Sequence, residues 1–246
     1  MTTKAKWLVG VAAVVAAGVA VIGWFALEGV PAVHLHLPKY SLEQADSAHR
    51  WYRRTTVHFG SAVYLNDFED YPIWLANPVP THAIGRAPFG NSLVCSIPGQ
   101  EPTDYIAVDC GSEMEAYAVF RNANHSSFDW RHARFQAMDY AGTMMQADHK
   151  RTVDSTLIAD VVRTLREDAP VSLSLPASVN STNLARLNLY SDALPGLMFC
   201  PAIYRDSAGP VYLAESFAVE YSNRTEKIHA QWIPASESFT QWLRTQ

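Results

Sequence analysis

The stretch that decides the fold is residues 91–121, NSLVCSIPGQEPTDYIAVDCGSEMEAYAVFR. It contains two short apolar runs, at 91–97 and 104–110, separated by the turn-forming residues PGQEP. A third run, at 113–121, alternates apolar and polar side chains, which is typical of a strand with one buried face. The sequence therefore predicts a three-stranded antiparallel meander.

Two of the three cysteines lie in this meander. If the turn is centred near residue 102, the position opposite Cys95 on the next strand lies within one residue of Cys110. Cysteines that face each other on an antiparallel hairpin are close enough to form a disulfide bond. We therefore expect a Cys95–Cys110 disulfide, with Cys200 left as a buried free thiol in the apolar run 197–200.

After the meander, residues 152–167 carry an apolar stripe at helical spacing and end before Ala169–Pro170, so a helix is expected there. Residues 184–190 fit either a strand or a short helix. Further strands are expected at 171–175, 197–205, 211–221 and 227–234, followed by a closing helix at 236–244.

Three other segments have weaker patterns. Ser41 is a residue type that favours the N-cap position, so a helix is expected at 42–54. The prolines within 68–86 favour an irregular connection, and 122–149 is expected to be a long loop with a short helix around 133–140. Because two meanders are separated by a helix, the sequence predicts an α+β domain, with antiparallel β-meanders and flanking helices.

Residues 7–27, WLVGVAAVVAAGVAVIGWFAL, contain no charged side chain. As a helix this run would span about 30 Å, the thickness of a bilayer's hydrocarbon core. Lys4 and Lys6 precede it, so residues 1–6 are expected in the cytoplasm. The sequence therefore predicts a single-pass membrane protein with a stalk at 28–40 and a periplasmic or extracellular domain at 41–246. A cleaved secretory signal is the alternative.

Charge and motifs exclude several classes of partner. The chain has 19 Lys and Arg against 24 Asp and Glu, a formal net charge of −5, whereas nucleic-acid binding needs clustered basic residues. The sequence also lacks the glycine-rich GxGxxG and GxxxxGK phosphate-binding motifs. We therefore expect neither a nucleic-acid partner nor a bound cofactor.

The densest group of reactive side chains lies between His125 and His149. His125, Asp129 and His132 are candidates for metal-binding or acid–base roles, since a catalytic zinc site takes three such ligands. The two histidines are seven positions apart, not four as in HExxH sites. A polar loop with incidental histidines is the simpler explanation, and no metal site is predicted.

The aromatic and proline-rich region between residues 68 and 89 is a candidate contact surface, with Tyr71, Trp74 and Phe89 as binding candidates. Packing of these rings beneath an irregular loop is the alternative. The function expected from the sequence is a membrane-tethered, non-enzymatic interaction or accessory domain with a protein partner in the envelope, for example an envelope-assembly subunit or an immunity-type inhibitor. The alternative is an exported metal-dependent or acid–base hydrolase that uses the His125–His149 region.

Overall fold

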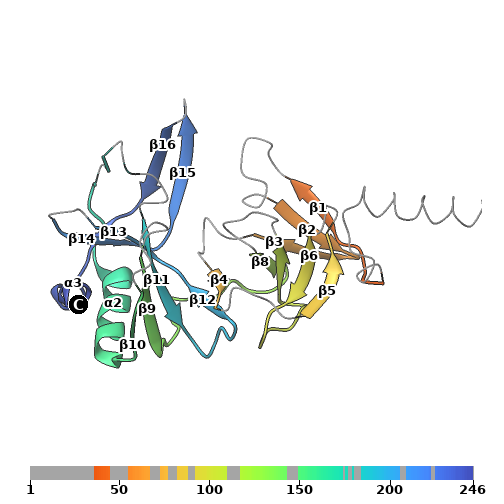
Figure 1. Ribbon diagram of the computed structural model, residues 1–246, viewed down its shortest axis with the longest axis horizontal. Helices are drawn as coiled ribbons and strands as arrows, with labels where there is room; N and C mark the ends of the chain where they lie inside the picture. Colours follow the sequence, from red (N-terminus) through yellow and green to blue (C-terminus); the bar gives the residue numbers. More distant parts are fainter. Residues whose placement is uncertain are drawn as a thin grey trace, which may run out of the picture.

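The computed structural model describes residues 36–44, 55–66, 73–76, 82–87, 92–109, 117–142, 149–173, 175–176, 179, 184–205, 209–222 and 225–245. Strands in antiparallel sheets are the main regular structure of this part of the chain, and two short helices are the rest of it. The predicted fold class, an α+β domain behind a helical anchor, is therefore wrong, and the fold is predominantly β. Figure 1 shows two lobes, with a single sheet on the N-terminal side and a sheet with helices on the C-terminal side.

The N-terminal lobe is a seven-stranded antiparallel sheet that closes on itself. Tyr40 N donates to Arg86 O at 2.9 Å and Arg86 N donates to Pro38 O at 3.0 Å, so the last strand borders the chain that leads into the first. In spatial order the strands are β1 (Ser41–Gln44), β2 (Thr55–Phe59), β3 (Ala62–Leu65), β8 (Tyr117–Asn122), β7 (Tyr105–Asp109), β6 (Leu93–Ser96) and β5 (His82–Arg86).

Side chains that point to the inside of the closed sheet form one core, which includes Val57, Val94, Ile106 and Phe120. The ring of Tyr40 also packs here, against the backbone of β5. A Cβ at Gly85 would lie 2.2 Å from the Tyr40 ring, so only glycine allows this approach. The segment expected to end the stalk is therefore part of the fold, since Tyr40 is buried.

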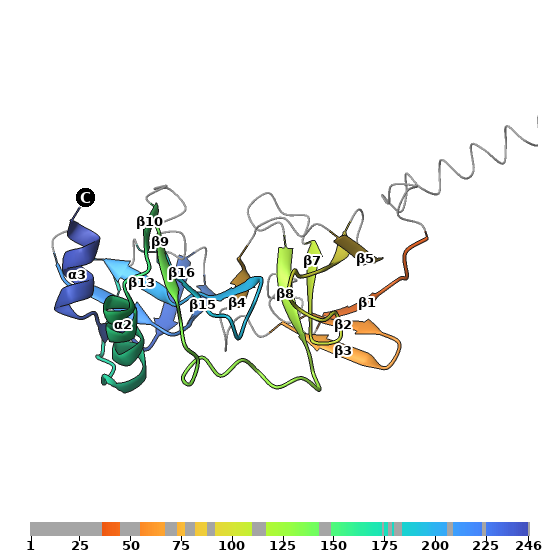
Figure 2. The same cartoon turned by 90° about the horizontal axis from the view of Figure 1, so that it is seen from below.

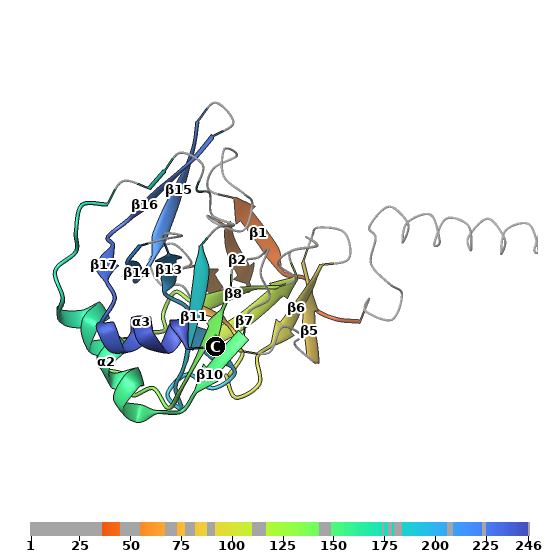
Figure 3. The ribbon, with the colours of Figure 1, turned by 60° about the vertical axis from the view of Figure 1, so that its left-hand side comes forward.

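The C-terminal lobe contains a second antiparallel sheet and a separate hairpin. The hairpin is formed by β15 (Phe217–Ser222) and β16 (Thr225–Ala230), which Figure 3 shows extending from the lobe. The main path of the sheet is β10 (His149–Thr152), β9 (Ala137–Ala141), β11 (Ala185–Tyr190), β13 (Ala202–Arg205), β14 (Val211–Ala214) and β17 (Ile233–Pro234); β12 (Leu197–Phe199) pairs with both β11 and β4 (Ile73–Leu75).

Helices α2 (Ser155–Glu167) and α3 (Glu237–Arg244) pack on one face of this sheet, as Figure 3 shows. The Asp154 side chain accepts hydrogen bonds from the first turn of α2, and Ser236 caps α3 in the same way. The helices predicted at 152–167 and 236–244 are confirmed. The apolar stripe of α2 is buried as expected, and it consists of Leu157, Ile158, Val161, Val162 and Leu165.

The two lobes meet through β4, which precedes β5 in the sequence but pairs with β12 of the other lobe. Leu75 and Leu197 from this pair pack against Cys95, Tyr105 and Ala107 on the outer face of the first sheet. Figure 2 shows residues 123–136 running from β8 to β9 along one side of the molecule, so the chain crosses between the lobes there as well.

Several predicted elements are corrected. The expected helix at 42–54 begins as strand β1 instead, because Leu42 pairs with Val57 across an antiparallel ladder. The helix expected around 133–140 is replaced by β9, which is held between β10 and β11. The irregular connection at 68–86 contains strands β4 and β5. The ambiguous segment 184–190 is strand β11, and the first meander of β6, β7 and β8 is confirmed.

The predicted Cys95–Cys110 disulfide is wrong. Cys95 is a buried free thiol, and it faces Ala107, three positions before Cys110. The reason is the turn, which closes earlier than its composition suggested: Asp104 N already donates to Glu101 O at 2.8 Å. Cys110 itself lies outside the described residues. Cys200 is buried and free, as expected.

The apolar run 7–27 also lies outside the described residues. Within the ranges given above, the structure contains no helix long and apolar enough to cross a membrane. On this finding the predicted single-pass topology is corrected, and so is the periplasmic or extracellular location that was inferred from it.

Candidate functional site

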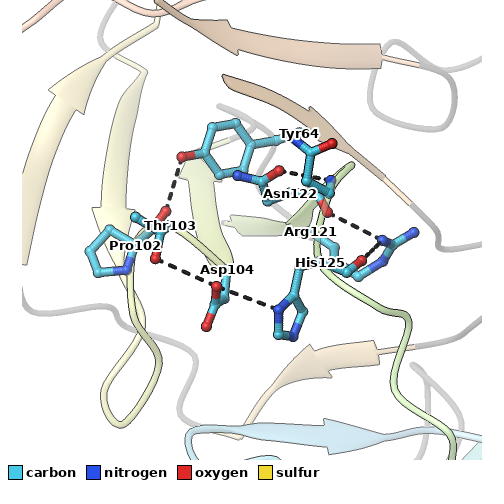
Figure 4. A network of polar contacts seen from close by, with 8 residues as sticks. Tyr64, Pro102, Thr103, Asp104, Arg121, Asn122 and His125 are labelled. Atoms are coloured by element: carbon cyan, nitrogen blue, oxygen red, sulfur yellow. Dashed lines mark hydrogen bonds and ion pairs between the residues drawn. The ribbon is translucent and has the colours of Figure 1, made fainter. Parts of the chain in front are cut away.

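His125, the first of the candidate catalytic residues, is held against the N-terminal lobe. Figure 4 shows its ring directed at the carboxylate of Asp104, with Nδ1 and Oδ1 3.4 Å apart. Its backbone carbonyl accepts a hydrogen bond from Arg121, and its ring packs edge-on against Tyr105 with centroids 5.3 Å apart. These contacts fix the chain where it leaves β8, which is a structural role.

Asp129 and His132 form a separate exposed pair, with His132 Nδ1 2.6 Å from Asp129 Oδ2. The hydrogen bond with His132 holds the pKa of the Asp129 carboxyl below its usual value. His125 is bonded to Asp104 and not to this pair. Across the described residues, no three His, Cys, Asp or Glu side chains are grouped so that they could hold a metal ion. The hydrolase alternative therefore gains no geometric support.

Among the binding candidates, Tyr71 and Phe89 lie outside the described residues. Trp74 lies on β4, opposite Met198 of β12, and is partly exposed. The guanidinium carbon of Arg186 lies over the Trp74 ring, 4.5 Å from its centroid. Trp74 is thus part of a sheet and stacks with a cation from a strand more than 100 residues later.

Strand register brings further polar and aromatic side chains to the same face of the second sheet. Arg151 of β10 and Asn188 of β11 both lie opposite Asp139 of β9. Directly opposed side chains point to one face, and residues two apart in a strand share it, so Arg186 and Tyr190 lie on this face too. We call Trp74, Asp139, Arg151, Arg186 and Tyr190 the arginine–aromatic face.

The opposite face of the same strands is apolar. Met138, Leu187 and Leu189 alternate with the residues above and are fully buried in the core beneath the helices. The period-2 alternation of a strand therefore separates one packed face from one polar and aromatic face. On β13 and β14, the side that continues this face carries Ala202, Tyr204 and Ala214. It is covered by the segment around Leu173 and by the base of the hairpin, through Phe217 and Ile228.

Tyr190 is the most constrained residue of the arginine–aromatic face. Its hydroxyl donates to Asp139 Oδ2 at 2.7 Å, and the guanidinium of Arg151 lies 5.3 Å from its ring centroid. Burial, together with the hydrogen bond to Asp139, raises the pKa of Tyr190 above its ordinary value. The phenol is therefore a neutral hydrogen-bond donor at physiological pH.

Arg151 Nε lies 3.7 Å from Asp139 Oδ1, and the Arg151 side chain is 63% exposed while that of Asp139 is 19% exposed. Beneath the face, the Cys200 thiol donates to Asn188 Oδ1 at 3.4 Å, and burial raises the pKa of this thiol. Cys200 therefore packs beneath the face and holds Asn188, and it does not act as a nucleophile. The face offers stacked guanidinium groups and aromatic rings, which suit binding rather than covalent chemistry.

Sequence reasoning selected Trp74 but missed the other four residues of the face. They come from three strands, β9, β10 and β11, of which the first two were expected to be loop or helix. The apolar-polar alternation in the run ARLNLY of β11 was the available signal, since it places Arg186, Asn188 and Tyr190 on one side of a strand.

No family model, curated protein or solved structure matches this chain.

Proposed function

We propose that this chain is a protein-interaction module that binds its partner through the arginine–aromatic face. The observation that carries the proposal is the stacking of Arg186 on Trp74 beside the Arg151–Tyr190 pair, on a strand face left uncovered by the helices. Trp, Tyr and Arg are the residue types that dominate binding energy at protein interfaces.

Preorganisation supports the same proposal. An arginine that binds a partner loses side-chain entropy when it becomes fixed. Stacking on Trp74, and the bond from Tyr190 to Asp139, already restrict these side chains in the unbound chain. Less of the binding free energy is then lost to ordering, and the face is prepared for a defined partner.

The test is affinity capture with the full chain as bait and quantitative identification of the proteins retained. We expect a stoichiometric partner that is lost with Trp74→Ala and with Arg186→Gln. Two control variants at an exposed aromatic residue and an exposed arginine, Phe59→Ala and Arg134→Gln, should retain it. A partner retained equally by all four variants would place the binding surface elsewhere and overturn the proposal.

A further inference from the structure

Four cations stack on aromatic rings in the described part of the chain, and they provide an internal comparison. Arg131 lies over Trp130 and also pairs with Glu215 at 2.6 Å. Lys150 lies over Trp242 and donates to the carbonyl of Thr245 at 2.6 Å. Arg151 lies over the ring of Tyr190 and beside the carboxylate of Asp139. Three of the four cations therefore contact both an aromatic ring and an oxygen acceptor.

Arg186 is the exception. Its guanidinium lies over Trp74, but no carboxylate among the described residues lies within ion-pair distance of it. Asp139, the acid of the same face, is engaged by Tyr190 and Arg151. Stacking on Trp74 sets the orientation of the N–H groups of Arg186. No carboxylate in the described part of the molecule pairs with its positive charge.

From this difference we propose that the occupant of the arginine–aromatic face is an acidic segment of a partner protein, and that one of its carboxylates pairs with Arg186 on the Trp74 ring. The proposal rests on the function proposed above and names the chemistry of the partner. The Arg131–Trp130–Glu215 arrangement shows the completed form of the same contact within this chain. Guanidinium groups bind carboxylates through paired, charge-assisted hydrogen bonds.

The surroundings favour a polypeptide over a nucleic acid. The whole chain has a formal net charge of −5, so an extended polyanion would be repelled beyond the immediate face. Partly exposed Met198 lies opposite Trp74 and provides an apolar contact beside the cation. A segment that combines a carboxylate with apolar side chains fits this mixture.

The experiment measures fluorescence anisotropy of a labelled peptide that carries one Glu among Phe and Ser residues against the full chain, with a twin peptide in which Gln replaces that Glu as the neutral comparison. We expect the Gln twin to bind about tenfold more weakly, as loss of a charge-assisted pair implies. Arg186→Gln should remove this preference, and Arg186→Lys should restore part of it, because lysine keeps the charge but not the fork. Arg134→Gln should leave it intact.

Three results would overturn the acidic-segment proposal: equal binding of both peptides, a preference for Glu that survives in Arg186→Gln, or no binding of either peptide up to about 1 mM. Equal binding that is lost in Trp74→Ala would leave the face as an interaction surface for neutral segments. The proposed function itself would fail in a different experiment, the affinity capture, if a partner were captured equally by all variants of the face.

Discussion

The indole Nε1 of Trp130 donates a 2.6 Å hydrogen bond to Glu215 Oε1, 85 positions later in the chain. Arg131 donates to the other carboxylate oxygen, also at 2.6 Å. Trp130 is fully buried and stacks on Phe199, with ring centroids 4.9 Å apart. A single carboxylate therefore fixes the segment that crosses between the lobes to the second sheet.

Glu215→Ala should lower the free energy of unfolding by about 2–3 kcal/mol, because the buried indole N–H and the Arg131 guanidinium both lose their acceptor. Urea unfolding followed by circular dichroism measures the change. Glu101→Ala, in the exposed turn between β6 and β7, is the control and should stay within about 0.5 kcal/mol of the wild type. A Glu215→Ala variant as stable as this control would show that Glu215 does not hold the crossing segment.

The junction between the lobes gives a second prediction. Gly196 has φ +73°, and a Cβ there would lie 2.1 Å from the carbonyl oxygen of Pro98 in the other lobe. Gly196→Ala should therefore cost about 3 kcal/mol or more, from backbone strain and overlap together.

Gly60→Ala is the matched control for this junction, since Gly60 has φ +58° but its Cβ would meet nothing within 4 Å. It should lose only the backbone contribution, about 1 kcal/mol. Thermal unfolding of the two variants separates strain from overlap. Equal losses in melting temperature would mean that the Pro98–Gly196 contact is not closely packed.

Alkaline pH should weaken the closed sheet. Burial raises the pKa of Tyr40 from 10.0 to about 12. Because the folded state holds this proton more tightly, the stabilisation is complete below pH 10 and is lost as the pH rises toward 12. The urea midpoint should therefore fall across this range, and it should fall less steeply in Tyr40→Phe. If the urea midpoint fell equally with pH in the wild type and in Tyr40→Phe, ionisation of Tyr40 would not be the cause of the lost stability.

The correction of the disulfide is also testable. Burial raises the pKa of the Cys95 thiol to about 11, so at pH 8 little thiolate is present to react. In the native protein, alkylation of Cys95 by iodoacetamide should be slow at pH 8, and unfolding without reductant should make it complete. Peptide mapping by mass spectrometry reads the modified residue. If Cys95 stays unmodified in denaturant until a reductant is added, it is disulfide-bonded and the correction is wrong.

Local sequence signals predicted those elements whose neighbours are close in the chain. The helix α2 was readable because its stripe and its cap are both local. The β6–β7–β8 meander was readable for the same reason, but its register was not, since the position of the turn depends on hydrogen bonds such as Asp104 N to Glu101 O.

Strands that pair with distant partners were not predictable from local pattern. β9 pairs with β11, and the paired residues are between 45 (Ala141 and Arg186) and 53 (Ala137 and Tyr190) positions apart in the chain. This pairing overrides the helix-forming composition around residue 137. The arginine–aromatic face was hidden for this reason. Trp74 was visible as an isolated aromatic, but only the register of β4, β9, β10 and β11 shows that Arg186, Tyr190 and Asp139 lie beside it.

The last prediction separates binding from folding at Arg186. Its stacking on Trp74 is partly exposed, so Arg186→Gln should cost less than about 1 kcal/mol of stability. Arg166→Gln is the contrasting variant, because Arg166 donates to the carbonyl oxygens of Trp130 and Ala133 at 3.1 and 3.0 Å. Losing those charged hydrogen bonds should cost about 1.5–3 kcal/mol. Urea unfolding of the two variants decides the point: if Arg186→Gln costs as much as Arg166→Gln, Arg186 supports the fold, and any binding it loses cannot be assigned to a missing contact.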